Sequence, residues 1–184
     1  LGDGSFSSRA TPSFATADPE LAAALEAALP DIELVDKGGY NYVLRHIYGH
    51  RGGVIVANPV KVALRQLALA GLKSEAKFVP DVYKHNGRAV RLALLQGLLD
   101  ADGGPVTQEG RSCRVQYTTT SPRLRDDVVH LVRSLGGVAT WRVREADGRP
   151  PGLVNGRSVP YRNDAYCLDI RLPHGVEPFR LERK

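Results

Sequence analysis

The chain has 184 residues, of which 42% are hydrophobic, so it can build one sizeable core or two small coupled lobes without disulfides. Its cysteines, Cys113 and Cys167, lie 54 positions apart with no CxxC or clustered Cys/His spacing, which argues against structural zinc and favours buried free thiols. There is no signal-peptide pattern and no apolar run near the roughly 18 residues of a membrane span, so we expect a soluble cytoplasmic protein.

Positive charge is concentrated in the second half of the chain. Residues 1–110 carry 11 basic and 12 acidic side chains, whereas residues 111–184 carry 14 basic and 8 acidic ones. Of the 25 basic residues 19 are arginine, whose guanidinium binds phosphate and guanine edges bidentately. The bias favours a nucleic-acid partner; a high-GC genome, which also enriches arginine, alanine and glycine, is the alternative explanation.

Signals for helices and strands follow one another in chain order. Residues 5–16 predict one or two short strands. An Asp or Asn N-cap followed by proline predicts helices over 18–29 and 58–70, and residues 32–35 and 40–46 predict two strands joined by a Gly-Gly turn.

A second pass then repeats the same order. A helix is predicted over 88–100, a strand over 114–119, a Ser-Pro-capped helix over 121–135, and strands over 138–144 and 165–171.

The repeated order indicates an internal duplication of about 95 to 100 residues. It predicts an α+β fold of two pseudo-symmetric αββαββα lobes, residues 1–86 and 87–184. Each lobe would have an antiparallel sheet with helices on one face, leaving the other face free to bind a ligand.

The most specific segment is Leu94–Gly103. Gly97 and Ala101 share one helical face, where small side chains let another helix approach closely. Asp102 falls at the C-terminal end of this helix, where an acid opposes the helix dipole, so we expect a cation there. Gly103 is predicted to be the left-handed cap.

The same ending stands 99 positions upstream, in Leu1-Gly2-Asp3-Gly4. If two such helices pack through their small faces, Asp3 and Asp102 come together. Two carboxylates so close need compensating charge, which hard divalent cations such as Mg²⁺ supply. This pattern is typical of phosphodiester hydrolysis.

The residues Leu95–Gly103 resemble the motif of the LAGLIDADG homing endonucleases, in their single-chain, two-motif, intein-associated form, and depart from it at Gln96 and Leu99. Upstream, Lys77-Phe78-Val79-Pro80 looks like the lysine block of that family. The segment from Ser121 to Gly136 looks like the helix block that follows the second motif.

The resemblance implies a monomeric, site-specific, nucleoid-associated endonuclease that cuts double-stranded DNA at a long asymmetric target. Its cofactor would be Mg²⁺, with Mn²⁺ or Ca²⁺ able to substitute for binding. Asp3 and Asp102 would bind metal, assisted by the carbonyls of Gly2 and Ala101. Lys77 would stand near the scissile phosphates, and Lys184 is the candidate for a second such lysine.

The first motif helix is expected to be truncated before Leu1. Splicing residues such as a terminal His-Asn pair are not found, so we expect the nuclease portion alone.

Several strands alternate an apolar face with a face of Arg, Gln, Asn, Ser or Thr, the side chains that read base edges in a major groove. The resemblance implies two sheets forming a DNA-binding saddle. The predicted DNA-binding residues are Ser5, Ser7, Arg9, Asn41, Arg45, Arg114, Gln116, Thr118, Thr140, Arg142 and Arg144. For any one strand, an ordinary solvated face is the alternative, and the loop 145–164 could contact phosphates or be disordered.

Other residues have simpler interpretations. Asp126-Asp127 would complement the dipole of its helix, Asp100 would cap or pair locally, and Trp141 would be a core residue.

Two rival functions stay open at this point. One is a catalytically inactive, maturase-like or regulatory nucleic-acid-binding protein of the same family. The other is a globular domain unrelated to nucleic acid, in which the motif is a coincidence.

Overall fold

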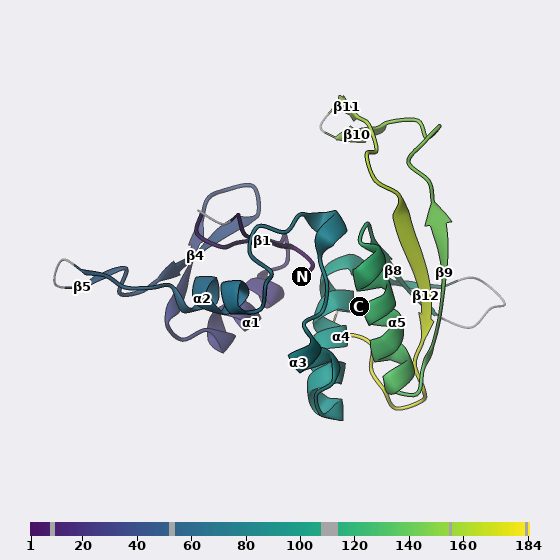
Figure 1. Cartoon of the computed structure of the whole chain (residues 1–184), viewed down its shortest axis with the longest axis horizontal. Coiled ribbons are helices and arrows are strands. Elements are labelled where there is room, and N and C mark those ends of the chain that lie inside the picture. The colour runs from purple at the N-terminus through teal and green to yellow at the C-terminus, as the bar shows by residue number, and fades with distance from the viewer. Residues whose placement is uncertain (8–9, 52–53, 108–113, 155, 183) are drawn as a thin grey trace. The chain divides into compact units, whose positions relative to one another are not determined.

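The computed structural model describes residues 1–7, 10–51, 54–107, 114–154, 156–182 and 184. It divides into two compact units, Leu1–Leu72 and Lys73–Lys184 (Figure 1). The sequence placed the lobe boundary after residue 86. Residues 73–86 belong to the second unit, where Lys77 and Val79 are hydrogen-bonded to Ser121 and Asp127.

Unit 1 contains a four-stranded antiparallel sheet and two helices. Asp18 caps the first helix by accepting from the Glu20 N–H at 3.0 Å, as its sequence predicts. The elements are β1 Gly4–Ser5, β2 Ser13–Ala15, α1 Pro19–Ala28, β3 Ile32–Asp36, β4 Asn41–His46, the hairpin β5 His50–Arg51 and β6 Val54–Ile55, and α2 Pro59–Gln66.

Unit 2 contains a second four-stranded antiparallel sheet, with α5 packed on three of its strands and α4 on two. Ser121 caps α5 by accepting from the Leu124 N–H at 3.1 Å. The elements are η1 Ser74–Ala76, α3 Asp81–Lys84, α4 Arg88–Asp102, β7 Gly103–Val106, β8 Arg114–Thr119, α5 Pro122–Ser134, β9 Val138–Arg144, the hairpin β10 Gly152–Val154 and β11 Arg157–Val159, and β12 Ala165–Arg171.

The two sheets have the same topology. Their strand orders are β1-β2-β4-β3 and β7-β8-β12-β9, and every neighbouring pair is antiparallel. In both sheets the first glycine of the edge strand lies opposite an aromatic residue, Phe14 for Gly4 and Tyr117 for Gly103. The predicted α+β fold and internal duplication are therefore confirmed at the level of each unit.

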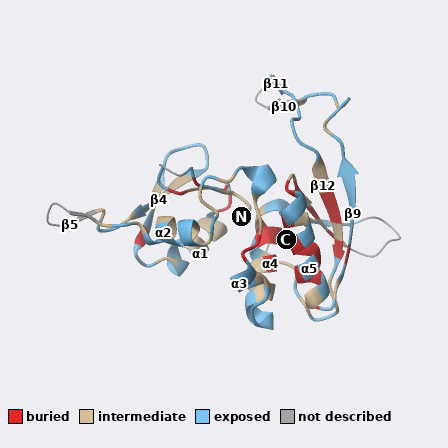
Figure 2. Cartoon of the chain, in the orientation of Figure 1, coloured by how far each residue is buried: buried red, intermediate tan, exposed pale blue. Residues whose placement is uncertain are grey.

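The best-sealed core lies in unit 2, where α4 and α5 cover one face of the sheet (Figure 2). Leu95, Leu99, Leu131, Leu168 and Ile170 are all fully buried there. In unit 1 the buried side chains include Phe6, Ile32 and Leu44, but α1 and α2 contribute no buried residue. None of the described helices is long and apolar enough to span a bilayer.

Two predicted helix ends are wrong. The helix expected to reach residue 70 ends at Gln66, because Ala68 adopts a left-handed φ of 56°. Gly103 is not a left-handed cap: its φ of −103° and ψ of 165° are extended, and the chain passes directly from α4 into β7. Glycine is required there by close packing, since an added Cβ would lie 2.7 Å from the Leu99 carbonyl oxygen.

We expect Gly103→Ala to lower the free energy of unfolding by about 2 kcal/mol, because the backbone at Leu99 must shift to admit the methyl group. Gly104→Ala is the matched control, since a Cβ there meets no described atom within 4 Å. Urea unfolding of both variants measures the difference. Equal stability of the two would show that this junction is not tightly packed.

Candidate functional site

Asp3 and Asp102 occupy matching positions in the two units. Asp102 is the last residue of α4 and is exposed, and β7 begins at the next residue. Asp3 directly precedes β1, and its carbonyl accepts from the Ala15 N–H at 3.1 Å. Each carboxylate thus stands immediately before the edge strand that opens its sheet. The predicted pairing of the two carboxylates stays a prediction.

A cation does lie at the C-terminal end of α4, and it is the ammonium group of Lys184. Its Nζ donates to the carbonyls of Leu99 at 3.1 Å, Asp100 at 2.7 Å and Gly103 at 2.6 Å. These bonds satisfy helix-terminal carbonyls and oppose the negative end of the helix dipole. The candidate second lysine therefore lies beside the helix end that carries Asp102.

Asp100 fixes the segment that delivers Lys184. Its side chain is buried, at 3% exposure, and accepts from the backbone N–H groups of Arg180, at 3.2 Å to each oxygen, and Leu181, at 3.4 Å. The expectation of a local cap is thus wrong, because its partners lie 80 residues further along the chain.

The oxygen donors near Asp102 suit a hard divalent cation. A carboxylate and main-chain carbonyls are the ligand types that Mg²⁺ prefers. The residue four positions after Ala101 is Pro105, which has no N–H to donate to the Ala101 carbonyl. Within the described ranges no group of three or more His, Cys, Asp or Glu side chains gathers.

The small face of α4 is open within the described atoms. Gly97 is exposed, and a Cβ built on it would meet nothing within 4 Å. The close helix approach predicted for Gly97 and Ala101 stays a prediction.

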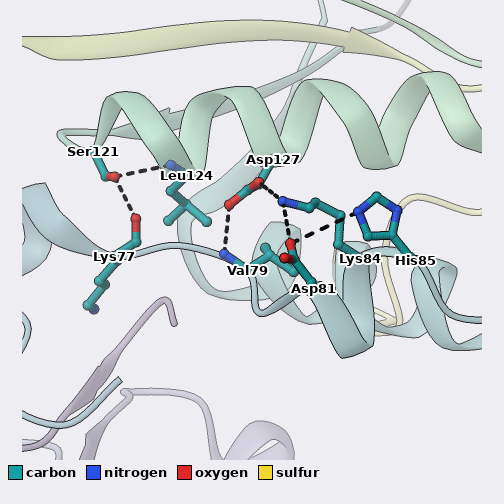
Figure 3. A network of polar contacts seen from close by, with 8 residues as sticks. All are labelled: Lys77, Val79, Asp81, Lys84, His85, Ser121, Leu124 and Asp127. Atoms are coloured by element: carbon teal, nitrogen blue, oxygen red, sulfur yellow. Dashed lines mark hydrogen bonds and ion pairs between the residues drawn. The ribbon is translucent and has the colours of Figure 1, made fainter. Parts of the chain in front are cut away.

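The lysine block is attached to the start of α5 (Figure 3). The Ser121 hydroxyl donates to the Lys77 carbonyl at 2.6 Å, and the Val79 N–H donates to Asp127 at 2.8 Å. Both anchoring residues, Ser121 and Asp127, are buried, at 0% and 5% exposure. In Figure 3 the Lys77 side chain points away from this network. Its backbone is therefore fixed while its side chain is directed elsewhere.

Asp127 is the centre of this network, which corrects its interpretation as a dipole-complementing residue. Besides Val79, it binds the Lys84 ammonium at 2.8 Å, and Lys84 also binds Asp81 at 2.9 Å. The hydrogen bond to Asp127, followed by that to Asp81, raises the pKa of Lys84. The hydrogen bond from Lys84 lowers the pKa of Asp81.

Six of the predicted DNA-contacting side chains share one face of the unit 2 sheet. In β8, Val115, Tyr117 and Thr119 are buried beneath the helices, and the alternate residues point to the other face. Residues that are paired across neighbouring strands point to the same face of a sheet, so the pairing of β12 with β8 and β9 extends this alternation to all three strands. This face, hereafter the open face of unit 2, carries Arg114, Gln116, Thr118, Thr140, Arg142 and Arg144.

The open face of unit 2 also carries an acid that we did not predict to contact DNA. Asp169 of β12 binds Arg114 at 2.9 Å and Arg142 at 3.2 Å. In unit 1, Arg45 is likewise paired with an acid, Glu33, at 2.8 Å. No signal within a single strand predicts these pairs, because they depend on cross-strand register.

The other predicted DNA-contacting residues belong to unit 1, and those that the structure describes differ in their contacts. Ser5 lies opposite Ser13 on the edge of the unit 1 sheet, and the Ser7 hydroxyl accepts from the Ala10 N–H at 3.3 Å. The Asn41 amide donates to the carbonyls of Gly38 and Gly39, at 3.4 and 3.0 Å, and so supports its own turn. Arg9 and Cys113 lie outside the described residues.

One aromatic residue, Trp141, differs from expectation. Trp141 is 46% exposed, with the Arg125 guanidinium 4.2 Å from its ring centroid, so it is not a core residue. Tyr117, which lies opposite Gly103, is 1% exposed, and its hydroxyl has no hydrogen-bond partner among the described residues. Burial raises the pKa of Tyr117, and the nearby charge of Asp102 raises it further. The free thiol of Cys167 is buried, as predicted.

Residues 89–159 match the family model of the LAGLIDADG-like domain. The matched range starts inside α4, contains Ala101 and Asp102, and ends with β11. The motif named from the sequence is therefore part of a domain-length similarity.

Similar segments occur in two mycobacterial proteins. Protein RecA of Mycobacterium tuberculosis (strain ATCC 25618 / H37Rv) is 26% identical over 145 residues, 78% of this chain and 18% of that protein. Replicative DNA helicase DnaB of Mycobacterium intracellulare is 35% identical over 108 residues, 59% of this chain and 16% of that protein. The chain thus spans less than a fifth of either relative.

Among solved structures, the chain is similar to the homing endonuclease I-DmoI. Its mesophilic variants align with a TM-score of 0.47 at 15% identity, over 93% of this chain and 83% of that chain. I-DmoI in complex with DNA and Ca aligns with a TM-score of 0.45 at 16% identity, over 87% and 66% of the respective chains.

Lys84→Met should lower the free energy of unfolding by about 3 kcal/mol at neutral pH, because it removes the cationic partner of a carboxylate that is 6% exposed. The raised pKa means that the contribution of Lys84 is complete below its unfolded pKa, about 10.4, and is lost as pH rises through the higher folded value.

Urea unfolding at pH 7.5 and pH 11 tests this prediction of the Lys84 network. The difference between wild type and variant should shrink at the higher pH. The exposed Lys73→Met is the control and should change stability by less than about 0.5 kcal/mol. An equal difference at both pH values would contradict a charge-dependent contribution.

Tyr117→Phe should leave the protein as stable as the wild type or more stable by about 1 kcal/mol, because the change removes a buried hydroxyl that lacks a described partner. Chemical denaturation measures the change. A loss of 1 kcal/mol or more would show that the hydroxyl is hydrogen-bonded in solution.

Proposed function

We propose that this chain is the nuclease portion of an intein-associated homing endonuclease. It cuts double-stranded DNA at a long asymmetric site in a reaction that depends on a divalent metal, and it acts as a monomer with pseudo-two-fold symmetry in the cytoplasm, at the nucleoid. The observation that carries the proposal is the equivalence of Asp3 and Asp102. They stand 99 positions apart, each directly before the first strand of a sheet with the same topology.

Asp3 and Asp102 would hold the metal, with the carbonyls of Gly2 and Ala101 assisting. When bound, a divalent cation supplies Lewis-acid stabilisation of phosphate oxygens and lowers the pKa of its water. The chain's own contribution is to keep these oxygen donors at the ends of rigid elements.

The two candidate lysines would contribute positive charge. The Lys77 backbone is fixed by Ser121, and the neighbouring Val79 is fixed by Asp127. The Lys77 ammonium would act near a scissile phosphate. Lys184 sits at the end of α4 and would lower the local negative potential that Asp102 and the helix dipole create.

Substrate binding would use the arginine-bearing open face of unit 2 and the corresponding face of unit 1 around Arg45. Side chains of Arg, Gln and Thr on adjacent strands suit base edges in a major groove. Different side chains on the two faces predict unlike half-sites and hence an asymmetric target.

The similar segments in RecA and DnaB support an inserted element. RecA and the helicase DnaB are different proteins, and the segment similar to this chain makes up less than a fifth of each of them. A segment shared in this way is expected of a mobile insertion carried within a host protein.

We expect Asp102→Asn and Asp3→Asn each to slow DNA cleavage about 100-fold or more, because loss of a metal ligand forfeits several kcal/mol of transition-state stabilisation. Cleaved sites are first selected from a randomised duplex library with Mg²⁺, and the rates are then measured on the selected site. Asp31→Asn removes the same charge at an exposed turn and should cut normally.

DNA binding in Ca²⁺ accompanies each rate measurement. The two ligand variants should retain binding within about threefold, since phosphate and base contacts supply most of the affinity. Tight, salt-sensitive binding by a wild type that cuts under no divalent metal would contradict the nuclease and establish the binding-only function.

A further inference from the structure

Asp169 links two arginines along a diagonal of the unit 2 sheet. On one side of β12, Cys167 lies opposite Arg142 of β9 and Asp169 lies opposite Thr140 of β9. On the other side, Asp169 lies opposite Gln116 of β8. Arg114 lies on β8, two residues before Gln116. It is therefore on the opposite side of β12 from Arg142, and closer to the C-terminal end of β12. The carboxylate therefore lies between the two guanidinium groups, 2.9 Å from Arg114 and 3.2 Å from Arg142.

The exposed fraction of the side chain increases from Arg114 through Asp169 to Arg142. The side chains of Arg114 and Asp169 are 20% and 25% exposed, whereas that of Arg142 is 58% exposed. Arg114 neutralises Asp169 from the shielded side, and Arg142 contacts it through Nη1 alone. A guanidinium has five N–H donors in a planar fork, so this contact orients Arg142 without using its full donor set.

A carboxylate is an unfavourable group on a surface that binds a polyanion. It repels phosphate, so its value must come from orienting its neighbours or from contacting bases. Because an arginine reads guanine through two parallel hydrogen bonds to O6 and N7, the plane of the guanidinium must be correctly set. An unanchored arginine on the same strand would instead follow phosphates with little sequence preference.

We propose that Asp169 is a specificity-determining positioning residue that holds Arg142 in the orientation needed to read a guanine. The inference rests on the proposed DNA-binding function of the open face, and it identifies one base contact there. Arg114 is the anchor of Asp169, and Arg142 is the residue that touches the base.

The test is a double-mutant cycle on base preference. A target is selected with the wild-type protein in Ca²⁺, and duplexes carrying each base at each position are then titrated against wild type, Arg142→Lys, Asp169→Asn and the double variant. Arg142→Lys keeps the charge and loses the planar fork. Asp31→Asn again serves as the charge-matched control, at an exposed turn outside the predicted DNA contacts.

The wild type should prefer guanine at one position by roughly tenfold, the scale of a single bidentate contact. Arg142→Lys and Asp169→Asn should each reduce that preference to about twofold at the same position, and the double variant should lose no more than either alone. Asp169→Asn should also bind non-specific DNA more tightly and steepen the slope of log K against log salt by up to about 0.9. The control should match the wild type in all three respects.

Each other outcome counts against a specific claim. Unchanged preference in Asp169→Asn, or losses at different positions in the two single variants, overturns the positioning role. Additive losses would mean that Asp169 reads a base on its own, which also overturns it. A folded wild type that selects no duplex rejects the proposed function itself, and thermal melting of every variant separates these results from unfolding.

Discussion

The C-terminal end of α4 imposes the main electrostatic problem in unit 2. A helix presents unpaired carbonyls at this end, and here the chain adds the carboxylate of Asp102. The Lys184 ammonium offsets both by binding three carbonyls, and Asp100 holds the segment that brings Lys184 there. The close contact at Gly103 then lets the first strand start without a loop. Negative charge, its compensation and the sheet edge are thus fixed in one small region.

A second buried polar network also holds unit 2 together. Asp127 and Ser121 attach the lysine block to α5, and α5 in turn covers β8, β9 and β12. Both networks join segments that are more than 40 residues apart in sequence. Unit 2 therefore positions its candidate catalytic groups through buried polar contacts, which are specific in geometry and costly to break.

Elements with strong local signals were predictable. The strands 114–119, 138–144 and 165–171 were placed to the residue, because alternation and glycine or proline boundaries mark them. Strand β7 was missed, because Gly103-Gly104-Pro105 has no β-forming pattern. The carboxylate Asp102 could be named from its motif alone. The partners of Asp127 and Asp169 could not, because they depend on long-range packing and register.

The thin core of unit 1 has a consequence for how this protein associates with its ligand. Neither α1 nor α2 seals a side chain from water, so local opening of this unit should require little free energy, and its amide hydrogens should exchange faster than those of α5. If DNA binding orders unit 1, part of the interaction free energy is consumed in that ordering. The association would then show a large negative heat-capacity change and an unfavourable entropy. Affinity would accordingly depend on temperature more steeply than rigid docking of unit 2 alone implies.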